Sequence, residues 1–212
     1  SQVQGDPITK PAAGWGFNRP TQDLVNAYEP NDPRKDATIL FPGETTPEGD
    51  FVPPGDSSDI FHLNVYYNQK SYVPFQLAAN TNQGADQDVR VLRYSEILLM
   101  NAEAANELGQ TGQALASLEQ VRARARSNSA DPAHTLPPVT TTDQSALRLA
   151  IWNERRVELA MEFDRFFDVI RQGRGPQIFG PKGFQAGKNE LMPIPQTEID
   201  LSGGVLTQNP GF

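Results

Sequence analysis

The sequence predicts a mainly α-helical fold: a helix hairpin plus a long third helix, wrapped by long irregular loops with few short strands. Apolar residues recur at the helical period of 3.6 between residues 91 and 173. The 18 prolines and 17 glycines gather mainly before residue 90 and after Gly173. We therefore expect a loop-rich segment at 1–90 and a helical region at 91–212, both in one domain that is a fragment of a longer protein.

The loop-rich segment is expected to contain short helices and possible short strands. One helix is predicted within "PTQDLVNAYEPNDPR". Thr21 can cap this helix, Leu24, Val25 and Tyr28 form a short apolar face, and Pro30 ends it.

Two antiparallel helices are predicted next, joined by "GQTG". The first begins near Val91 and stops at Gly109, and further apolar residues off its main stripe suggest contacts on more than one side. The second runs from about Gln113 to Arg126. Small residues let the two helices approach closely, and their spacing resembles one tetratricopeptide-type hairpin. The apolar stripe expected on the first helix consists of Val91, Tyr94, Leu98, Asn101, Ala102, Ala105 and Leu108.

The third helix is expected to begin after Thr142 or Asp143 and to end at Gly173. Its predicted apolar arc consists of Leu149, Trp152, Leu159, Phe163, Phe166, Phe167 and Ile170. Arg156 falls in the middle of this arc, so we expect it to point into the core or a cleft and to form a structural ion pair. Glu103 or a loop aspartate can be its partner. Other charges, Glu154 and Glu158 among them, are expected on a solvated or loop-covered face.

Charge and composition exclude several classes of function. The net charge of −8 argues against nucleic acid as a partner, and the absence of cysteine rules out a thiolate metal site or a thiol nucleophile. No apolar run is long enough to span a membrane. Only two histidines are present, and no nucleotide-binding or hydrolase motif occurs. We expect no metal, no cofactor and no enzyme, although two carboxylates in one cleft would suit a hydrolase.

Aromatic and amide side chains in the loops are the candidate ligand contacts. A sugar ring stacks its apolar face on an aromatic side chain, while its hydroxyls bond to amides. The alternative is that these aromatics cover the helical core. The candidate ligand-binding residues are Trp15, Tyr66, Tyr67, Asn68 and Tyr72.

Several ordered blocks resemble the SusD/RagB family of outer-membrane nutrient-binding lipoproteins. "GWGFNRPTQDLVNAYEPNDPR" is similar to the segment that precedes the family's C-terminal part. The other blocks are "RYSEILLMNAEAANELG", "ALASLEQVRARA", "ERRVELAMEFDRFFDVIRQG", "ELMPIPQTEID" and "LTQNPGF".

The resemblance implies a non-catalytic protein of the bacterial cell surface that binds glycan or peptide. It implies attachment to the outer membrane through a lipidated cysteine outside this chain, and a complex with a TonB-dependent SusC-like transporter that receives the ligand. The family's N-terminal half is not in this chain, and its ligand contacts vary, so the resemblance assigns no binding residue. The alternative function is a helical-repeat module that binds a peptide or protein.

Overall fold

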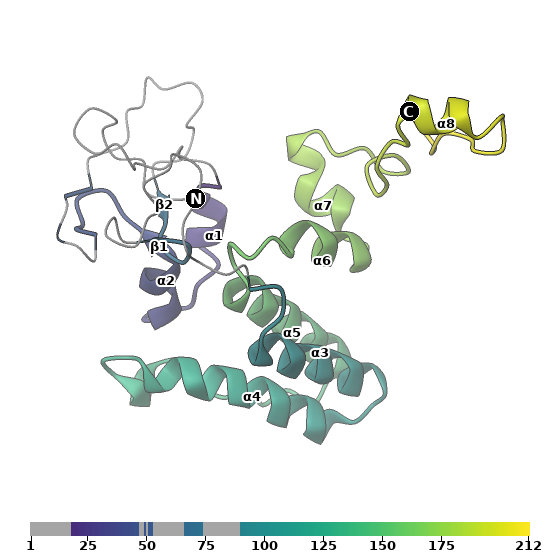
Figure 1. The fold of residues 1–212 in the computed structure, drawn as a ribbon. Helices are drawn as coiled ribbons and strands as arrows, with labels where there is room; N and C mark the ends of the chain where they lie inside the picture. Colours follow the sequence, from purple (N-terminus) through teal and green to yellow (C-terminus); the bar gives the residue numbers. More distant parts are fainter. Residues whose placement is uncertain (1–17, 47–48, 50, 53–65, 74–89) are drawn as a thin grey trace. The chain divides into compact units, whose positions relative to one another are not determined.

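A computed structural model, drawn in Figure 1, describes residues 18–46, 49, 51–52, 66–73 and 90–212. The chain divides into two compact units, Ser1–Phe163 and Asp164–Phe212. The division expected near residue 90 stays a prediction. None of the helices in the described ranges combines the length and the apolar character that a membrane crossing requires.

The first unit is mainly helical, as predicted, and its described strands are short. β1 and β2 pair antiparallel, with Ile39 opposite Asn68 and Leu40 opposite Tyr67. The elements that the structure describes in this unit are α1 (Gln22–Val25), α2 (Pro33–Thr38), β1 (Ile39–Leu40), β2 (Tyr67–Asn68), α3 (Tyr94–Glu107), α4 (Thr111–Ser127), the 3-10 turn η2 (Pro132–His134) and α5 (Gln144–Glu158).

The predicted hairpin is formed by α3 and α4, and α5 packs against both. Gly109 ends the first helix with a φ of +72°, a left-handed conformation that glycine adopts without strain. Small residues lie where the helices meet, as expected. The buried core of the three helices consists of Leu99, Ala102, Ala105, Ala114, Leu118, Val121, Leu147 and Ile151.

The stripe predicted for α3 is partly wrong. Ala102 and Ala105 are buried, but Tyr94 is 70% exposed and Leu108 is 73% exposed. The buried face instead includes Leu99, because α4 and α5 together set which side of the helix is covered.

The short elements before α3 pack on α5 through a second apolar cluster. Val25, Tyr28 and Ile39 surround Val157 of α5. The predicted cap of α1 is confirmed, since the Thr21 hydroxyl accepts a hydrogen bond from the amide of Leu24. The helix ends earlier than predicted, at Val25.

The prediction of one helix from residue 142 to Gly173 is wrong. α5 ends at Glu158, and α6 (Arg165–Arg171) begins after a break. Met161 and Phe163 within the break have φ values of +67° and +75°. A right-handed helix cannot pass through such residues, so the backbone divides at this point.

The predicted apolar arc of this helix is also partly wrong. Leu149 is 50% exposed and Phe163 is 75% exposed, whereas Glu154 and Glu158 are both 3% exposed. The sequence predicted a solvated or a loop-covered face for these two glutamates, and in the structure other parts of the chain cover them. The residues of α5 that are buried are Leu147, Ile151, Glu154, Arg155, Val157 and Glu158.

The second unit contains α6, α7 (Gly175–Phe179), the 3-10 turn η3 (Gly180–Lys182) and α8 (Gln196–Leu201). Phe166 and Phe179 stack with ring centroids 5.9 Å apart. The side-chain amide of Gln208 both donates to and accepts from the backbone of Ile194 at 2.8 Å. The "QN" of the C-terminal block therefore holds the extended "LMPIP" run in place.

Candidate functional site

Glu158 of α5 is the centre of a buried cluster of arginines and carboxylates. Its Oε1 accepts hydrogen bonds from Arg93 at 2.6 Å and Arg124 at 2.5 Å, and its Oε2 accepts one from Arg34 at 3.0 Å. Burial by itself would raise the pKa of Glu158, but the hydrogen bond from Arg93 and the charges of Arg124 and Arg93 lower this pKa to about 2. The carboxylate is therefore ionised at neutral pH.

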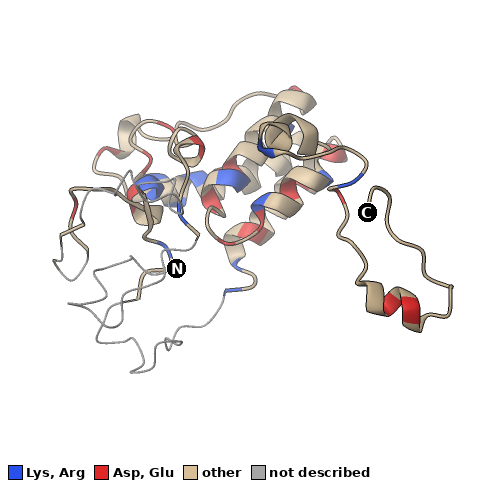
Figure 2. Cartoon of the chain, turned by 90° about the horizontal axis from the view of Figure 1, so that it is seen from above, with Lys and Arg blue, Asp and Glu red and all other residues tan. Residues whose placement is uncertain are grey.

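Glu154 lies one turn before Glu158 and extends the cluster toward α4. It accepts a hydrogen bond from Arg34 at 2.5 Å and another from Arg122 at 2.7 Å. Asp32 caps α2 and holds the Arg34 guanidinium at 2.7 Å. Figure 2 shows basic and acidic residues interleaved along the helices. The cluster thus ties α2, α4 and α5 together.

Lys70 connects the segment after β2 to the end of α5. Its ammonium donates to the backbone oxygens of Glu158 at 2.7 Å and Ala160 at 3.1 Å, and it pairs with Glu162 at 2.5 Å. Burial lowers the pKa of Lys70, while the hydrogen bond and charge of Glu162 oppose this change. The charges of the "ERRVELAMEFD" segment therefore hold the short N-terminal elements on the helices.

The candidate ligand residues occupy different environments. Tyr66 is partly exposed, its hydroxyl donates to Gln22 Oε1 at 2.5 Å, and its ring meets that of Phe41 edge-on. Tyr72 is also partly exposed, and Trp15 lies outside the described residues. Tyr67 and Asn68 differ from this pattern, as both are buried in β2.

Tyr67 and Asn68, which were also predicted as ligand contacts, both occupy buried positions. Tyr67 is 5% exposed and lies beneath the guanidinium of Arg19, whose carbon is 4.5 Å from the ring centre. The Asn68 amide bonds to Ser71 in the turn that follows. Successive side chains of a strand point to opposite faces, so the burial of both residues means that both faces of β2 are covered at this point. The paired backbone of β2 thus lies between Tyr66 and Tyr72.

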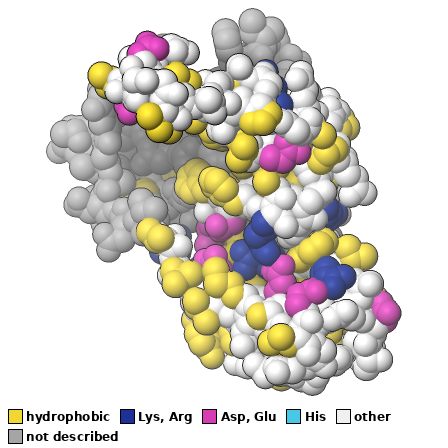
Figure 3. All heavy atoms as spheres, turned by 90° about the vertical axis from the view of Figure 1, so that its right-hand side faces the viewer, with side chains coloured by type: hydrophobic (Ala, Val, Ile, Leu, Met, Phe, Trp, Pro, Cys, Tyr) yellow, Lys and Arg dark blue, Asp and Glu magenta, His cyan; other side chains and the backbone are white. Residues whose placement is uncertain are grey.

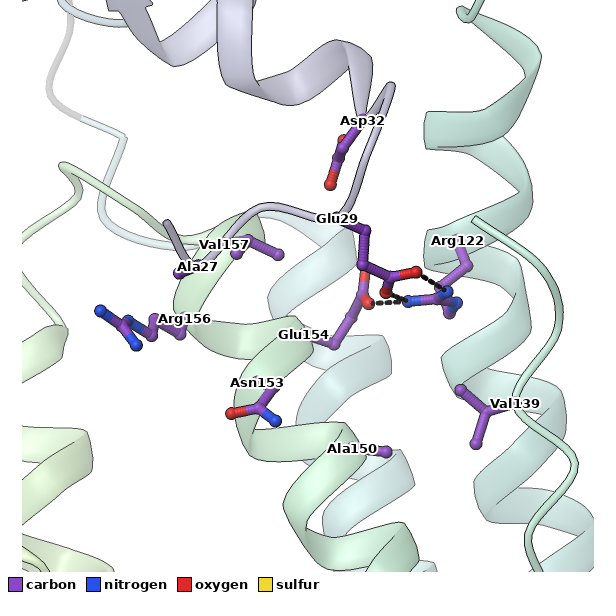
Figure 4. A pocket seen from close by; sticks show the side chains of 10 residues that line it. All are labelled: Ala27, Glu29, Asp32, Arg122, Val139, Ala150, Asn153, Glu154, Arg156 and Val157. Atoms are coloured by element: carbon purple, nitrogen blue, oxygen red, sulfur yellow. Dashed lines mark hydrogen bonds and ion pairs between the residues drawn. The ribbon is translucent and has the colours of Figure 1, made fainter. Parts of the chain in front are cut away.

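Arg156 lies at the edge of a cavity of about 370 Å³ in the first unit. Its guanidinium pairs with Asp23 of α1 at 2.5 Å, and its side chain is 20% exposed. The fully buried arginine of this turn is Arg155 instead. Figure 4 shows the ten lining residues: Ala27, Glu29, Asp32, Arg122, Val139, Ala150, Asn153, Glu154, Arg156 and Val157.

The importance of Arg34, Arg93 and Arg122 was not apparent from the sequence. Arg122 and its neighbours on α4 have the spacing of residues that complement a helix C-terminus. Arg122 is buried, however, and reaches Glu29 and Glu154. The available signal was the excess of arginine and glutamate within apolar helical segments.

Among the residues that the structure describes, no group of three or more His, Cys, Asp or Glu residues is placed to hold a metal ion.

Known proteins are similar to this chain over nearly its entire length. The family model described as the SusD family matches residues 1–212. SusD-like protein P2 of Formosa agariphila is 30% identical over 222 aligned residues, which cover 99% of this chain and 43% of that protein.

Solved structures agree with this match. A laminarin binding SusD-like protein superposes with a TM-score of 0.68 at 32% identity, covering 94% of this chain and 39% of that one. A SusD-like protein from Bacteroides fragilis gives a TM-score of 0.72 at 26% identity, covering 94% of this chain and 48% of that one. The chain thus spans less than half the length of these relatives. The chain belongs to the SusD family.

Proposed function

We propose that this chain is part of a cell-surface protein of the outer membrane that binds an oligo- or polysaccharide without cleaving it. In this proposal the protein is lipid-anchored through a segment outside the chain, and it delivers the glycan to a TonB-dependent SusC-like transporter. The observation that carries the proposal is the similarity to the laminarin binding protein, at 32% identity over 94% of the chain.

The partly exposed tyrosines on either side of β2 support glycan binding at this place. Tyr66 and Tyr72 flank the buried pair Tyr67 and Asn68, and the short sheet fixes the backbone between them. Aromatic rings held in this way offer stacking surfaces for sugar rings at little entropic cost. We propose Tyr66, Tyr72 and Trp15 as ligand contacts, with Tyr67 and Asn68 as their support.

Affinity electrophoresis and calorimetry on the full-length protein test this proposal with laminarin and a panel of other polysaccharides. Tyr72→Ala and Tyr66→Ala are expected to weaken binding of the best glycan by up to about tenfold, because each removes a stacking surface. Tyr66→Phe keeps the ring and serves as the control.

Three outcomes would argue against the proposal. Failure of the whole panel to bind, or full binding by both alanine variants, would exclude these loops as a glycan site. Release of new reducing ends from a bound glycan would show catalysis. Co-purification with a TonB-dependent transporter tests the delivery step separately.

A second candidate function is favoured by the exposed side of α3. Tyr94, Ile97, Met100 and Leu108 form an apolar stripe on this helix, and each is at least 42% exposed. Figure 3 shows hydrophobic side chains at the surface beside charged ones. Such a stripe suits the apolar face of a peptide helix. Peptide binding that is lost in Ile97→Glu, in a protein that binds no glycan, would support this alternative.

A further inference from the structure

We infer that the cavity beside Arg156 is a separate binding site for a short neutral saccharide of one or two rings. This site goes beyond the proposed function, because the inference rests on the chemistry of the cavity itself. None of the loop tyrosines lines the cavity. It lies between α5, α4 and the connection from α1 to α2, all within the first unit.

Small side chains create the space. Ala150 and Val157 of α5 and Ala27 of the α1–α2 connection line the cavity, and Val139 closes another side (Figure 4). The volume of about 370 Å³ is near the lower end of the range for small-molecule pockets, roughly 300 to 1,000 Å³. The cavity therefore suits a chain end or a short oligosaccharide better than the middle of a polysaccharide.

The charges of the lining already have partners within the protein. Arg122 is held by Glu29 and Glu154, each at 2.7 Å, and Arg156 is held by Asp23. Asp32 is paired with Arg34. Because the lining charges of both signs are already paired, an ionic ligand would lose its hydration and gain little net electrostatic attraction. The arrangement therefore favours a neutral ligand.

The hydrogen-bonding groups that remain match hydroxyls. The Asn153 amide makes no hydrogen bond to any described residue, and it offers both a donor and an acceptor. The bonds that Arg156 makes to Asp23 use only Nη2, so its Nε and Nη1 remain as donors. The Glu29 side chain is 46% exposed, so its carboxylate can accept further bonds. Sugar hydroxyls both donate and accept, so different hydroxyls of one ligand can bond to each of these three groups.

The apolar part of the lining completes the match. Val139, Ala150 and Val157 present hydrocarbon to the same space as Asn153 and Glu29. A sugar ring carries C–H groups on its faces and hydroxyls on its rim, so one ring contacts both kinds of surface. A purely apolar ligand would leave the Asn153 amide and the Nε and Nη1 groups of Arg156 without partners after desolvation.

Calorimetry and saturation-transfer NMR on the full-length protein test this inference with D-glucose, maltose and cellobiose. We expect at least one of them to bind, and Asn153→Leu to weaken that binding by an order of magnitude without changing the melting temperature. Gln120→Leu, an exposed amide on α4 outside the lining, is the matched control and is expected to bind normally. Glucuronate tests the preference for a neutral ligand.

Several results would overturn the inference. These are the absence of binding by all three sugars, equal binding by Asn153→Leu, or tighter binding of glucuronate than of glucose. Loss of short-saccharide binding in Tyr72→Ala would show that the cavity is not separate from the loop site. Polysaccharide binding without short-saccharide binding would overturn the cavity site alone. The reverse pattern would support the cavity and overturn the loop site of the proposed function.

Discussion

Replacing Glu158 with glutamine tests whether the buried charge cluster holds the short N-terminal elements on the helices. Glutamine keeps the size of the side chain but removes the charge that Arg34, Arg93 and Arg124 share. Three guanidinium groups would then face a neutral amide. Glu154 would still pair with Arg34 and Glu162 with Arg93, but the charge at the centre of the cluster would be lost. We expect the free energy of unfolding to fall.

The pKa of Glu158 gives the magnitude. A lowering from 4.5 to about 2, at about 1.4 kcal/mol per pH unit, corresponds to about 3 kcal/mol of stability. Because the pKa is lowered in the folded protein, this contribution is present above pH 4.5 and is lost as the pH falls from 4.5 toward about 2. Glu158→Gln is therefore expected to be less stable at pH 7 and to lose less stability on acidification.

Urea denaturation of the full-length protein at pH 7 and at several pH values below 5, followed by circular dichroism, measures both effects. Glu107→Gln is the control, because Glu107 and its partner Arg148 form an exposed pair that solvent screens. The structural role of the cluster would be refuted if Glu158→Gln were as stable as Glu107→Gln at pH 7. It would also be refuted if Glu158→Gln lost stability as steeply as the wild type when the pH is lowered below 4.5.

Three further predictions concern local features of the fold. Gly109→Ala is expected to cost about 1 kcal/mol because its φ is +72°, whereas Gly112→Ala in the first turn of α4 is expected to be neutral or stabilising in the same denaturation assay. Asp143→Ala removes the cap of α5 and is expected to cost about 1 kcal/mol, while Thr142→Ala leaves stability unchanged. Gln208→Leu is expected to increase hydrogen exchange at the backbone amide that this side chain holds, and unchanged exchange would exclude its role as a clamp.

Local signals in the sequence were sufficient for several elements. Gly109 and Gly173 both mark helix ends in the structure with positive φ values, as their positions after apolar periodic segments predicted. The alanines of α3 and α4 lie in the hairpin interface for the expected steric reason. The break between α5 and α6 was not predictable, because the segment "LAMEFD" contains no glycine or proline and its apolar period continues.

The exposure of the candidate site residues depends on contacts between segments that are far apart in the sequence. Tyr66 and Tyr67 are adjacent and chemically alike, yet one is partly exposed and the other is buried. Pairing of β2 with β1, nearly thirty residues earlier in the chain, decides between them. The cavity beside Arg156 likewise combines residues from α4, α5 and the α1–α2 connection, which no local pattern relates.

The sequence by itself determined the helical class, the hairpin, the caps and the membership of the SusD family, because each depends on residues close together or on ordered motifs. Only the tertiary structure decided that Glu154 and Glu158 are buried and that Asp23 is the partner of Arg156. A helical period shows which residues share a face, but not which face is covered. For α5 the covering segments carry Arg34, Arg93 and Arg122, so its charged face could be buried once these partners were brought to it.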